Sequence, residues 1–498
     1  MRLVASFTDM KSFLLLLLPL VLAAAIPNEL APVIDMARAA PGEFSADALI
    51  RIASTDKLEK VVRVQLLEEA FRRASEAQQP FKRQASILRV GGAAGFLQHA
   101  YQQNLDALSL RLRAVDAMLP LDSAKARSLF LEIPPLHLPK VTCDDYLVYD
   151  VSLFYQVLGK VARQSFSAKE AAAGAPIRLL ERFTGTLDSA AQVEPAARLL
   201  ASGELPNKDF EALVTALGGS LGRIYGDDRS FTASLSPASQ QVFSLLEDAR
   251  KRQVSPLALL EGYRAYLVNN LAGQRCADDD LMGNGQTYSL GAGPKAADSL
   301  GIAAADYFNQ KLAKPPILPL REEEVTPSKI EGAASGMRSC QEPECKQLAN
   351  QYRGLIFDAG GTPLSQAQRD TAEWRSRLQD LLNAMADWKE GSDTADIEQF
   401  RDKCALFGSL LGVIPPGPDS ERVLLAWLNY LEGNRIENDD RVGWFLPVNT
   451  LIGRVAIDPL GLGKLTEALR KARDPVIALY VELERVVPRT PDQIMPLL

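Results

Sequence analysis

The chain has 498 residues, of which 47% are hydrophobic and 23% charged, and its formal net charge at pH 7 is −7. This composition predicts a globular protein long enough for two or three cores, and its acidic balance argues against nucleic acid as a partner. The chain has two histidines, His99 and His137, which are far apart in sequence; this excludes a multi-histidine zinc site and argues against a Ser-His-Asp triad. We expect His99 to lie on a helix surface and His137 to lie in a linker.

The first predicted element is a secretory signal at residues 1–25. Lys11 supplies a positive n-region, residues 13–22 form an apolar h-region, and the alanines at 23–25 provide a small-residue cleavage site. The apolar run is shorter than the roughly 20 residues that span a bilayer, and no later segment qualifies as transmembrane. Met10 is an alternative start, because Asp9 is atypical of an n-region. We therefore expect an exported mature chain, periplasmic or extracellular.

Helical periodicity dominates the mature chain, which predicts an all-α, multi-helix fold. Residues 55–77 ("TDKLEKVVRVQLLEEAFRRASEA") place four apolar residues on one buried stripe: Leu67, Ala70, Phe71 and Ala74. Two i,i+4 ion pairs are expected on the solvated face of this helix: Glu68 with Arg72 and Glu69 with Arg73.

The segment "LLEEAFRRASEAQQP" (66–80) resembles the second helix of a tetratricopeptide repeat, with Phe71 and Ala74 at the spacing of that motif. The resemblance is confined to this segment. It implies an α-solenoid or stacked helical pairs in two to three subdomains, with a protein or peptide partner bound along a concave helix surface.

Two acidic stretches resemble metal-binding motifs. "CDDYLVYD" (143–150) is similar to the DDxxD motif of helical prenyl-binding enzymes, but Asp150 falls two positions late. We interpret Asp144 or Asp145 as a helix N-cap instead.

The second stretch, "DDDLMGNGQTYS" (278–289), begins like an EF-hand loop with Asp278 and Asp280. Met282 then occupies a ligand position, and Ser289 stands where the bidentate glutamate belongs. We therefore expect a glycine-rich loop. Together with the proline-rich stretch 131–142 and the long stretch 312–344, it divides the chain into predicted helical domains at 26–135, 136–312 and 340–498.

The cysteines are predicted to form disulfides, because an exported protein meets an oxidising environment. The five allow two bridges at most. Cys143 with Cys276 is one expected pair, and either Cys340 or Cys345 is expected to reach Cys404. Metal binding would need more ligands at tighter spacing, so no metal or cofactor is assigned.

The stretch "GLIFDAGGTPLS" (354–365) resembles the nucleophile motif of the haloacid dehalogenase phosphatases, with Asp358 in the nucleophile position. Gly360 replaces the second aspartate of that motif, and the surrounding sequence predicts helices where the family has a sheet. We therefore interpret the stretch as a glycine-rich turn that leads into a helix capped by Ser365.

Two C-terminal helices have clear boundaries. A capping box of Ser365 and Gln368 opens the first, Gly391 ends it, and its expected buried stripe comprises Trp374, Leu378, Leu381, Leu382, Met385 and Trp388. The second, at 418–434, has Asp419 or Ser420 as its expected N-cap and Gly433 as its end.

These observations favour a non-catalytic exported scaffold that binds a protein or peptide. One alternative is a carboxylate-dependent, glycan-active hydrolase on a helical fold, since such chemistry requires two acids and no histidine. A more remote alternative is a dehalogenase-like phosphatase that uses Asp358. No catalytic residue is assigned from the sequence.

Overall fold

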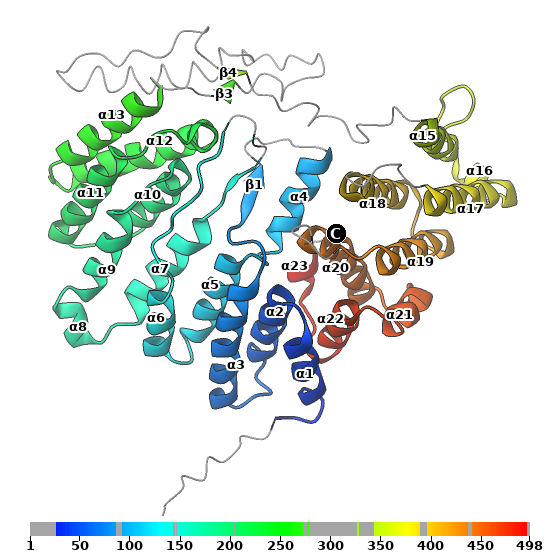
Figure 1. Cartoon of the computed structure of the whole chain (residues 1–498), viewed down its shortest axis with the longest axis horizontal. Helices are drawn as coiled ribbons and strands as arrows, with labels where there is room; N and C mark the ends of the chain where they lie inside the picture. The colour runs from blue at the N-terminus through cyan, green and yellow to red at the C-terminus, as the bar shows by residue number, and fades with distance from the viewer. Residues whose placement is uncertain are drawn as a thin grey trace, which may run out of the picture.

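Figure 1 shows the computed structural model of the chain. The structure describes residues 26–85, 92–142, 145, 147–203, 205–271, 276–277, 326–327, 343–388, 396–436 and 441–495. Helices contain 72% of these residues, which confirms the predicted all-α, multi-helix fold. The predicted signal at 1–25 lies outside this part of the chain. None of the described helices combines the length and hydropathy that a bilayer-spanning segment needs.

The N-terminal helices pack around α2 and α5, which contact each other and α3. These elements are α1 (Ala31–Ala39), α2 (Gly42–Ala53), α3 (Lys60–Arg73), η1 (Ala74–Glu76), β1 (Arg83–Ala85), α4 (Gly92–Gln102), α5 (Ala107–Met118) and α6 (Ser123–Leu131).

A second group of helices continues toward the upper left of Figure 1, where α10 packs on α12 and α11 on α13. Its elements are β2 (Leu147–Tyr149), α7 (Ser152–Gln164), α8 (Ala168–Ala172), α9 (Ala175–Thr184), η2 (Ala190–Gln192), α10 (Val193–Ala201), α11 (Asn207–Leu221), α12 (Asp228–Lys251) and α13 (Leu257–Leu271). Two small sheets accompany the helices. β1 pairs antiparallel with β2, and β3 (Cys276–Ala277) pairs parallel with β4 (Thr326–Pro327).

The C-terminal helices return from the upper right of Figure 1 to its lower centre. They are α15 (Pro343–Ile356), α16 (Gln366–Arg369), α17 (Ala372–Asp387), α18 (Asp396–Val413), α19 (Pro418–Gly433), α20 (Arg441–Ile457), α21 (Gly463–Arg470), α22 (Pro475–Val486) and α23 (Pro491–Ile494).

The two ends of the chain pack against each other. α22 contacts α1 and α2, and α20 contacts α4. Phe445 of α20 lies 4.8 Å from Phe44 of α2 and 4.4 Å from Tyr480 of α22, measured between ring centroids. Aromatic rings at these separations attract each other by more than the burial of their area accounts for.

The predicted division into domains at 26–135, 136–312 and 340–498 stays a prediction, and most of the linker at 312–344 lies outside the described residues.

The predicted stripe of α3 is confirmed, but the predicted ion pairs are wrong. Leu67, Ala70 and Phe71 are at most 2% exposed. Glu69 instead accepts hydrogen bonds from Arg38 of α1, at 2.9 and 2.8 Å, and Glu68 pairs with Lys125 of α6. The cations of neighbouring helices reach these carboxylates, because the predicted solvated face of α3 adjoins α1 and α6.

The expected helix cap at Asp144 or Asp145 is also wrong. Asp145 Oδ2 accepts a hydrogen bond from the backbone N–H of Thr142 at 2.6 Å, in an irregular segment. Residues 147–149 form β2, and the following helix, α7, begins only at Ser152 without a side-chain cap. Pairing with β1 takes the place of the helical turn. Asp144 lies outside the described residues.

The capping box of Ser365 and Gln368 is present, but it opens the one-turn helix α16. The longer helix, α17, begins at Ala372, and Thr371 caps it by accepting a hydrogen bond from Trp374 N at 3.2 Å. The predicted buried stripe of α17 is confirmed, with every member at most 5% exposed. Gly391 lies outside the described residues.

The helix α19 ends at Gly433 as expected, but its N-cap is neither Asp419 nor Ser420. Gly417 is the N-cap, with φ of 151°, and its backbone N–H donates to Ser420 Oγ at 2.9 Å. Asp419 instead pairs with Arg375 of α17 at 3.1 Å. The helix begins at Pro418, closer to the N-terminus than expected, because the fixed φ of proline suits the first helical position.

Candidate binding pockets

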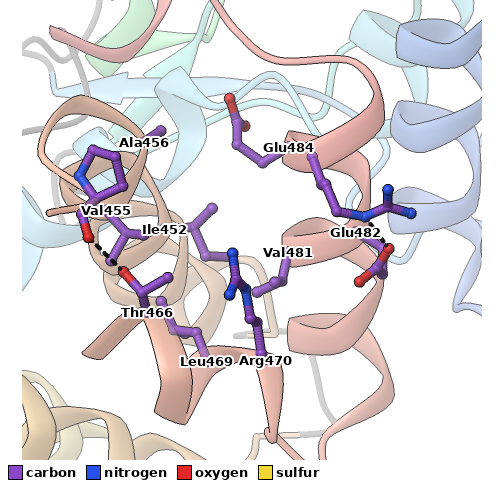
Figure 2. Close-up of a pocket in the computed structure, with 11 residues that line it drawn as sticks. Ile452, Val455, Ala456, Thr466, Leu469, Arg470, Val481, Glu482 and Glu484 are labelled. Carbon is purple, nitrogen blue, oxygen red and sulfur yellow. Dashed lines mark hydrogen bonds and ion pairs between the residues drawn. The ribbon is translucent and has the colours of Figure 1, made fainter. Parts of the chain in front are cut away.

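A small pocket lies between α20, α21 and α22, and we call it the α20–α22 pocket (Figure 2). Its volume is about 190 Å³, and its lining is mainly apolar. Apolar side chains of the three helices form its walls. These residues are Ile452, Val455, Ala456, Leu469 and Val481, of which Ile452 and Leu469 are also buried in the core.

Charged side chains surround this pocket, and most of them are paired. Glu482 accepts a hydrogen bond from Arg485 at 2.8 Å. Glu484 pairs with Arg51 at 3.1 Å and with Arg489 at 2.8 Å. Burial alone would raise the pKa of Glu484, but these two arginines lower it below its ordinary value.

Arg470 differs from its neighbours, because its guanidinium makes no ion pair with a described residue. Figure 2 shows its side chain reaching from α21 into the space between Ile452 and Val481. The pocket therefore combines apolar walls with one unpaired cation.

Exposed apolar residues follow the pocket along the chain. Leu460 is 94% exposed and Ile457 is 45% exposed, and both flank the lining residue Pro459. Contiguous exposed apolar surface, rather than a single exposed leucine, is typical of contact sites, and Leu460 directly follows the lining residue Pro459. One signal of this surface is visible in the sequence, an apolar residue within the Pro- and Gly-rich loop "DPLGLG". The convergence of three helices on the pocket was not predictable from it.

A second pocket, of about 310 Å³, contains the carboxylates of Asp150, which directly follows β2, and Glu194 of α10, and we call it the carboxylate pocket. Asp150 accepts from Lys82 at 3.2 Å and from the backbone N–H of Ser152 at 3.0 Å. Burial would raise the pKa of Asp150, but these contacts lower it. Burial raises the pKa of Glu194, although Arg198 opposes the shift. The pKa values of the two acids are thus shifted in opposite directions, a pattern that can support acid–base chemistry.

A third pocket, of about 540 Å³, lies where the two ends of the chain meet. Asp47 accepts hydrogen bonds from Arg113 and from the Tyr480 hydroxyl, both at 2.6 Å. Arg489 donates to Asn449 Oδ1 at 2.7 Å. Coulombic attraction to Arg113 and Arg51 outweighs burial and lowers the pKa of Asp47. The Asp47 carboxylate of this pocket is therefore already paired with neighbouring arginines, which is typical of a contact that holds two parts of a chain together.

Asp358 lies in a turn, as predicted. Its Oδ1 accepts from the backbone N–H groups of Gly360 and Thr362, both at 2.9 Å, and Gly361 adopts φ of 80°. α15 ends two residues earlier at Ile356, so a helix leads into Asp358 where the phosphatase family has a strand. The carboxylate is occupied in holding the turn closed.

Of the cysteines, Cys404 has a described side chain, and its thiol is free and buried. Burial raises the pKa of this thiol to about 12. The backbones of Cys276 and Cys345 lie in β3 and α15, but their side chains, like Cys143 and Cys340, lie outside the described part. Cys404 therefore forms no bridge to Cys340 or Cys345 in the structure, and the expected Cys143–Cys276 pair stays a prediction. The EF-hand-like stretch 278–289 is also outside it.

The two histidines lie apart, as the sequence indicated. His99 is exposed on α4, with Nδ1 3.2 Å from Gln102 Oε1, and the exposed His137 lies 2.7 Å from Asp188 Oδ2. Within the described ranges, no three His, Cys, Asp or Glu side chains gather closely enough to hold a metal ion.

Comparison of the chain with protein families, with curated proteins and with solved structures finds no match. The pockets of the described structure are therefore the basis on which its function is inferred.

Proposed function

We propose that this protein is an exported, non-catalytic helical scaffold that binds a protein or peptide at the α20–α22 pocket. The carrying observation is the apolar pocket beside the 94%-exposed Leu460. Burial of apolar surface is the dominant favourable contribution to most protein association. The unpaired Arg470 adds a preference for an acidic group next to the apolar anchor.

Export, the repeat-like arrangement and the disulfide are separate parts of this proposal, and each has its own support. Residues 1–25 support export, which fractionation of cells that express the full chain checks. The packing of α10 on α12 and of α11 on α13 supports a stacked-pair, repeat-like arrangement. Cys143 and Cys276 are the proposed disulfide pair.

Selection from a displayed random-peptide library on the purified protein tests the binding proposal. We expect enriched peptides to carry a large apolar residue with Asp or Glu nearby. Arg470→Glu should weaken their binding about tenfold, because it places like charges together. Arg473→Glu is the matched control, since Arg473 is exposed on the same segment but does not line the pocket. Equal effects of the two substitutions would contradict the proposal.

The carboxylate pocket supports a second candidate, a glycan-active hydrolase with Glu194 as general acid and Asp150 as its partner. The opposite pKa shifts of the two acids favour this assignment, and Tyr149 lines the same pocket. A panel of chromogenic glycosides should then be cleaved, and Glu194→Gln should lower kcat about 100-fold or more. Glu211→Gln, on the exposed side of α11, is the control. Absence of cleavage by the unmodified protein would remove this candidate.

A further inference from the structure

A separate pocket lies between α4, α18, α19 and α20, and we call it the Arg454 pocket. Its volume is about 350 Å³, which falls within the usual range for small-molecule sites. Phe96, Trp427, Leu446 and Pro447 make its walls predominantly apolar. It shares no lining residue with the α20–α22 pocket.

Arg454 is the one formally charged lining residue of this pocket. Its side chain is half-buried, its Nε is fully buried without a hydrogen-bond partner, and no described residue forms an ion pair with it. Desolvation lowers its pKa, with no carboxylate nearby to oppose the shift. By contrast, Arg435 and Arg441 on neighbouring segments reach Asp474 and Glu43 at 2.8 and 3.1 Å.

The other polar groups of the pocket do not compensate this charge. No acidic residue lines the pocket, and burial keeps the Cys404 thiol protonated at neutral pH by raising its pKa to about 12. Burying an unpaired guanidinium costs free energy. An anion that enters the pocket and pairs with Arg454 would offset that cost. A single guanidinium matches one carboxylate in both charge and geometry, whereas a phosphate monoester dianion would need further donors.

We propose that the Arg454 pocket binds a small apolar carboxylate, with the carboxylate on Arg454 and the apolar body against Phe96 and Trp427. This site is independent of the proposed peptide-binding function, because its lining comes from different residues and its ligand is a free small molecule.

Isothermal titration of the purified protein with 4-phenylbutyrate and octanoate tests this proposal, with 4-phenylbutan-1-ol and 1-octanol as uncharged counterparts. Both carboxylates should bind at least about tenfold more tightly than the matching alcohols. Arg454→Gln should weaken carboxylate binding by about 10- to 100-fold and leave alcohol binding unchanged. Arg454→Lys should restore part of the affinity, since it keeps the charge but loses the planar fork.

Gly408 of α18 allows the pocket to be filled without disturbing its walls. A Cβ built at Gly408, which lines the pocket, meets no atom within 4 Å. Gly408→Leu should therefore abolish binding of carboxylates and alcohols alike while the thermal midpoint is retained. Arg473→Gln is the matched control, because Arg473 is an exposed arginine that lines neither pocket, and its loss should leave carboxylate affinity unchanged.

Two results would overturn the proposal: no carboxylate binding by the unmodified protein, or binding that survives both Arg454→Gln and Gly408→Leu. A peptide ending in phenylalanine, compared with its C-terminal amide, distinguishes the source of the carboxylate. If the free-acid peptide binds at least about tenfold more tightly than 4-phenylbutyrate, with the same dependence on Arg454, the ligand is a chain terminus and the small-molecule assignment is wrong.

Discussion

Asp106 shows how burial at a single residue couples stability to pH. Its Oδ1 caps α5 by accepting from the backbone N–H of Ser109 at 2.9 Å, while its Oδ2 is buried and has no hydrogen-bond partner in the described structure. Burial raises the pKa of this carboxyl to about 6, although the Ser109 contact opposes the shift. The folded protein thus favours the protonated acid.

Asp106→Asn should remove this pH dependence, because the amide keeps an acceptor for Ser109 but carries no charge. For a raised pKa, the stabilising contribution is complete below about pH 4 and is lost as pH rises through about 6. The free energy of unfolding should therefore fall between pH 4 and 7 by up to about 3 kcal/mol more in the unmodified protein than in the variant.

Urea denaturation at a series of pH values measures this difference. Asp122→Asn is the control, because Asp122 caps α6 through the same contact, at 2.9 Å from Lys125 N, but is exposed. A stability difference between Asp106→Asn and the unmodified protein that stays constant from pH 4 to 7 would show that this carboxyl does not titrate as described.

The packing of one helix on another depends on the positions of their glycines, which have no side chain to keep the two backbones apart. α11 and α13 cross at a contact between two glycines. A Cβ built at Gly262 of α13 would lie 1.9 Å from the carbonyl oxygen of Gly218 on α11. Backbone meets backbone at this crossing, so neither helix can accommodate even a methyl group without moving.

Gly262→Ala should destabilise the protein by about 2–3 kcal/mol or more, because the methyl group forces the two helices apart. Gly219→Ala, on α11 beside the crossing, should have the opposite effect. A Cβ there meets no atom within 4 Å, and alanine favours a helix interior over glycine by up to about 1 kcal/mol. Urea denaturation monitored by circular dichroism measures both, and a destabilisation of equal size at the two positions would refute the crossing.

At the scale of the whole molecule, the chain closes on itself. Phe44 of α2 lies in an aromatic cluster with Phe445 of α20 and Tyr480 of α22. Ion pairs join the same segments, with Arg441 at 3.1 Å from Glu43 and Arg51 at 3.1 Å from Glu484. The N-terminal helix α2 and the C-terminal helices α20 and α22 therefore depend on each other for burial.

This closure predicts that a change in α2 is felt in the C-terminal helices. The four tryptophans lie between residues 374 and 444, so their fluorescence reports the C-terminal part. Phe44→Ala should cost about 3–5 kcal/mol and lower the denaturation midpoint of tryptophan fluorescence together with that of circular dichroism. Phe210→Ala, in the distant helix α11, should shift the fluorescence midpoint less. An unchanged fluorescence midpoint in Phe44→Ala would contradict the coupling.

The all-α fold and the buried faces of individual helices were predictable from local sequence. The stripes Leu67–Ala74 and Trp374–Trp388 were predictable, because a 3.6-residue period of apolar residues is a local property. The turn at Asp358 was also predictable because it is local: the hydrogen bonds that close it join residues within five positions of one another.

The tertiary structure alone decided the partner of each charge and the position of each pocket. Glu69 pairs with Arg38, 31 positions away, and Arg51 with Glu484, 433 positions away, so spacing along one helix could not assign them. The short strand β2 exists because β1 lies beside it. The α20–α22 pocket and the unpaired Arg454 arise where several helices converge, and such convergence depends on packing between segments that local periodicity does not encode.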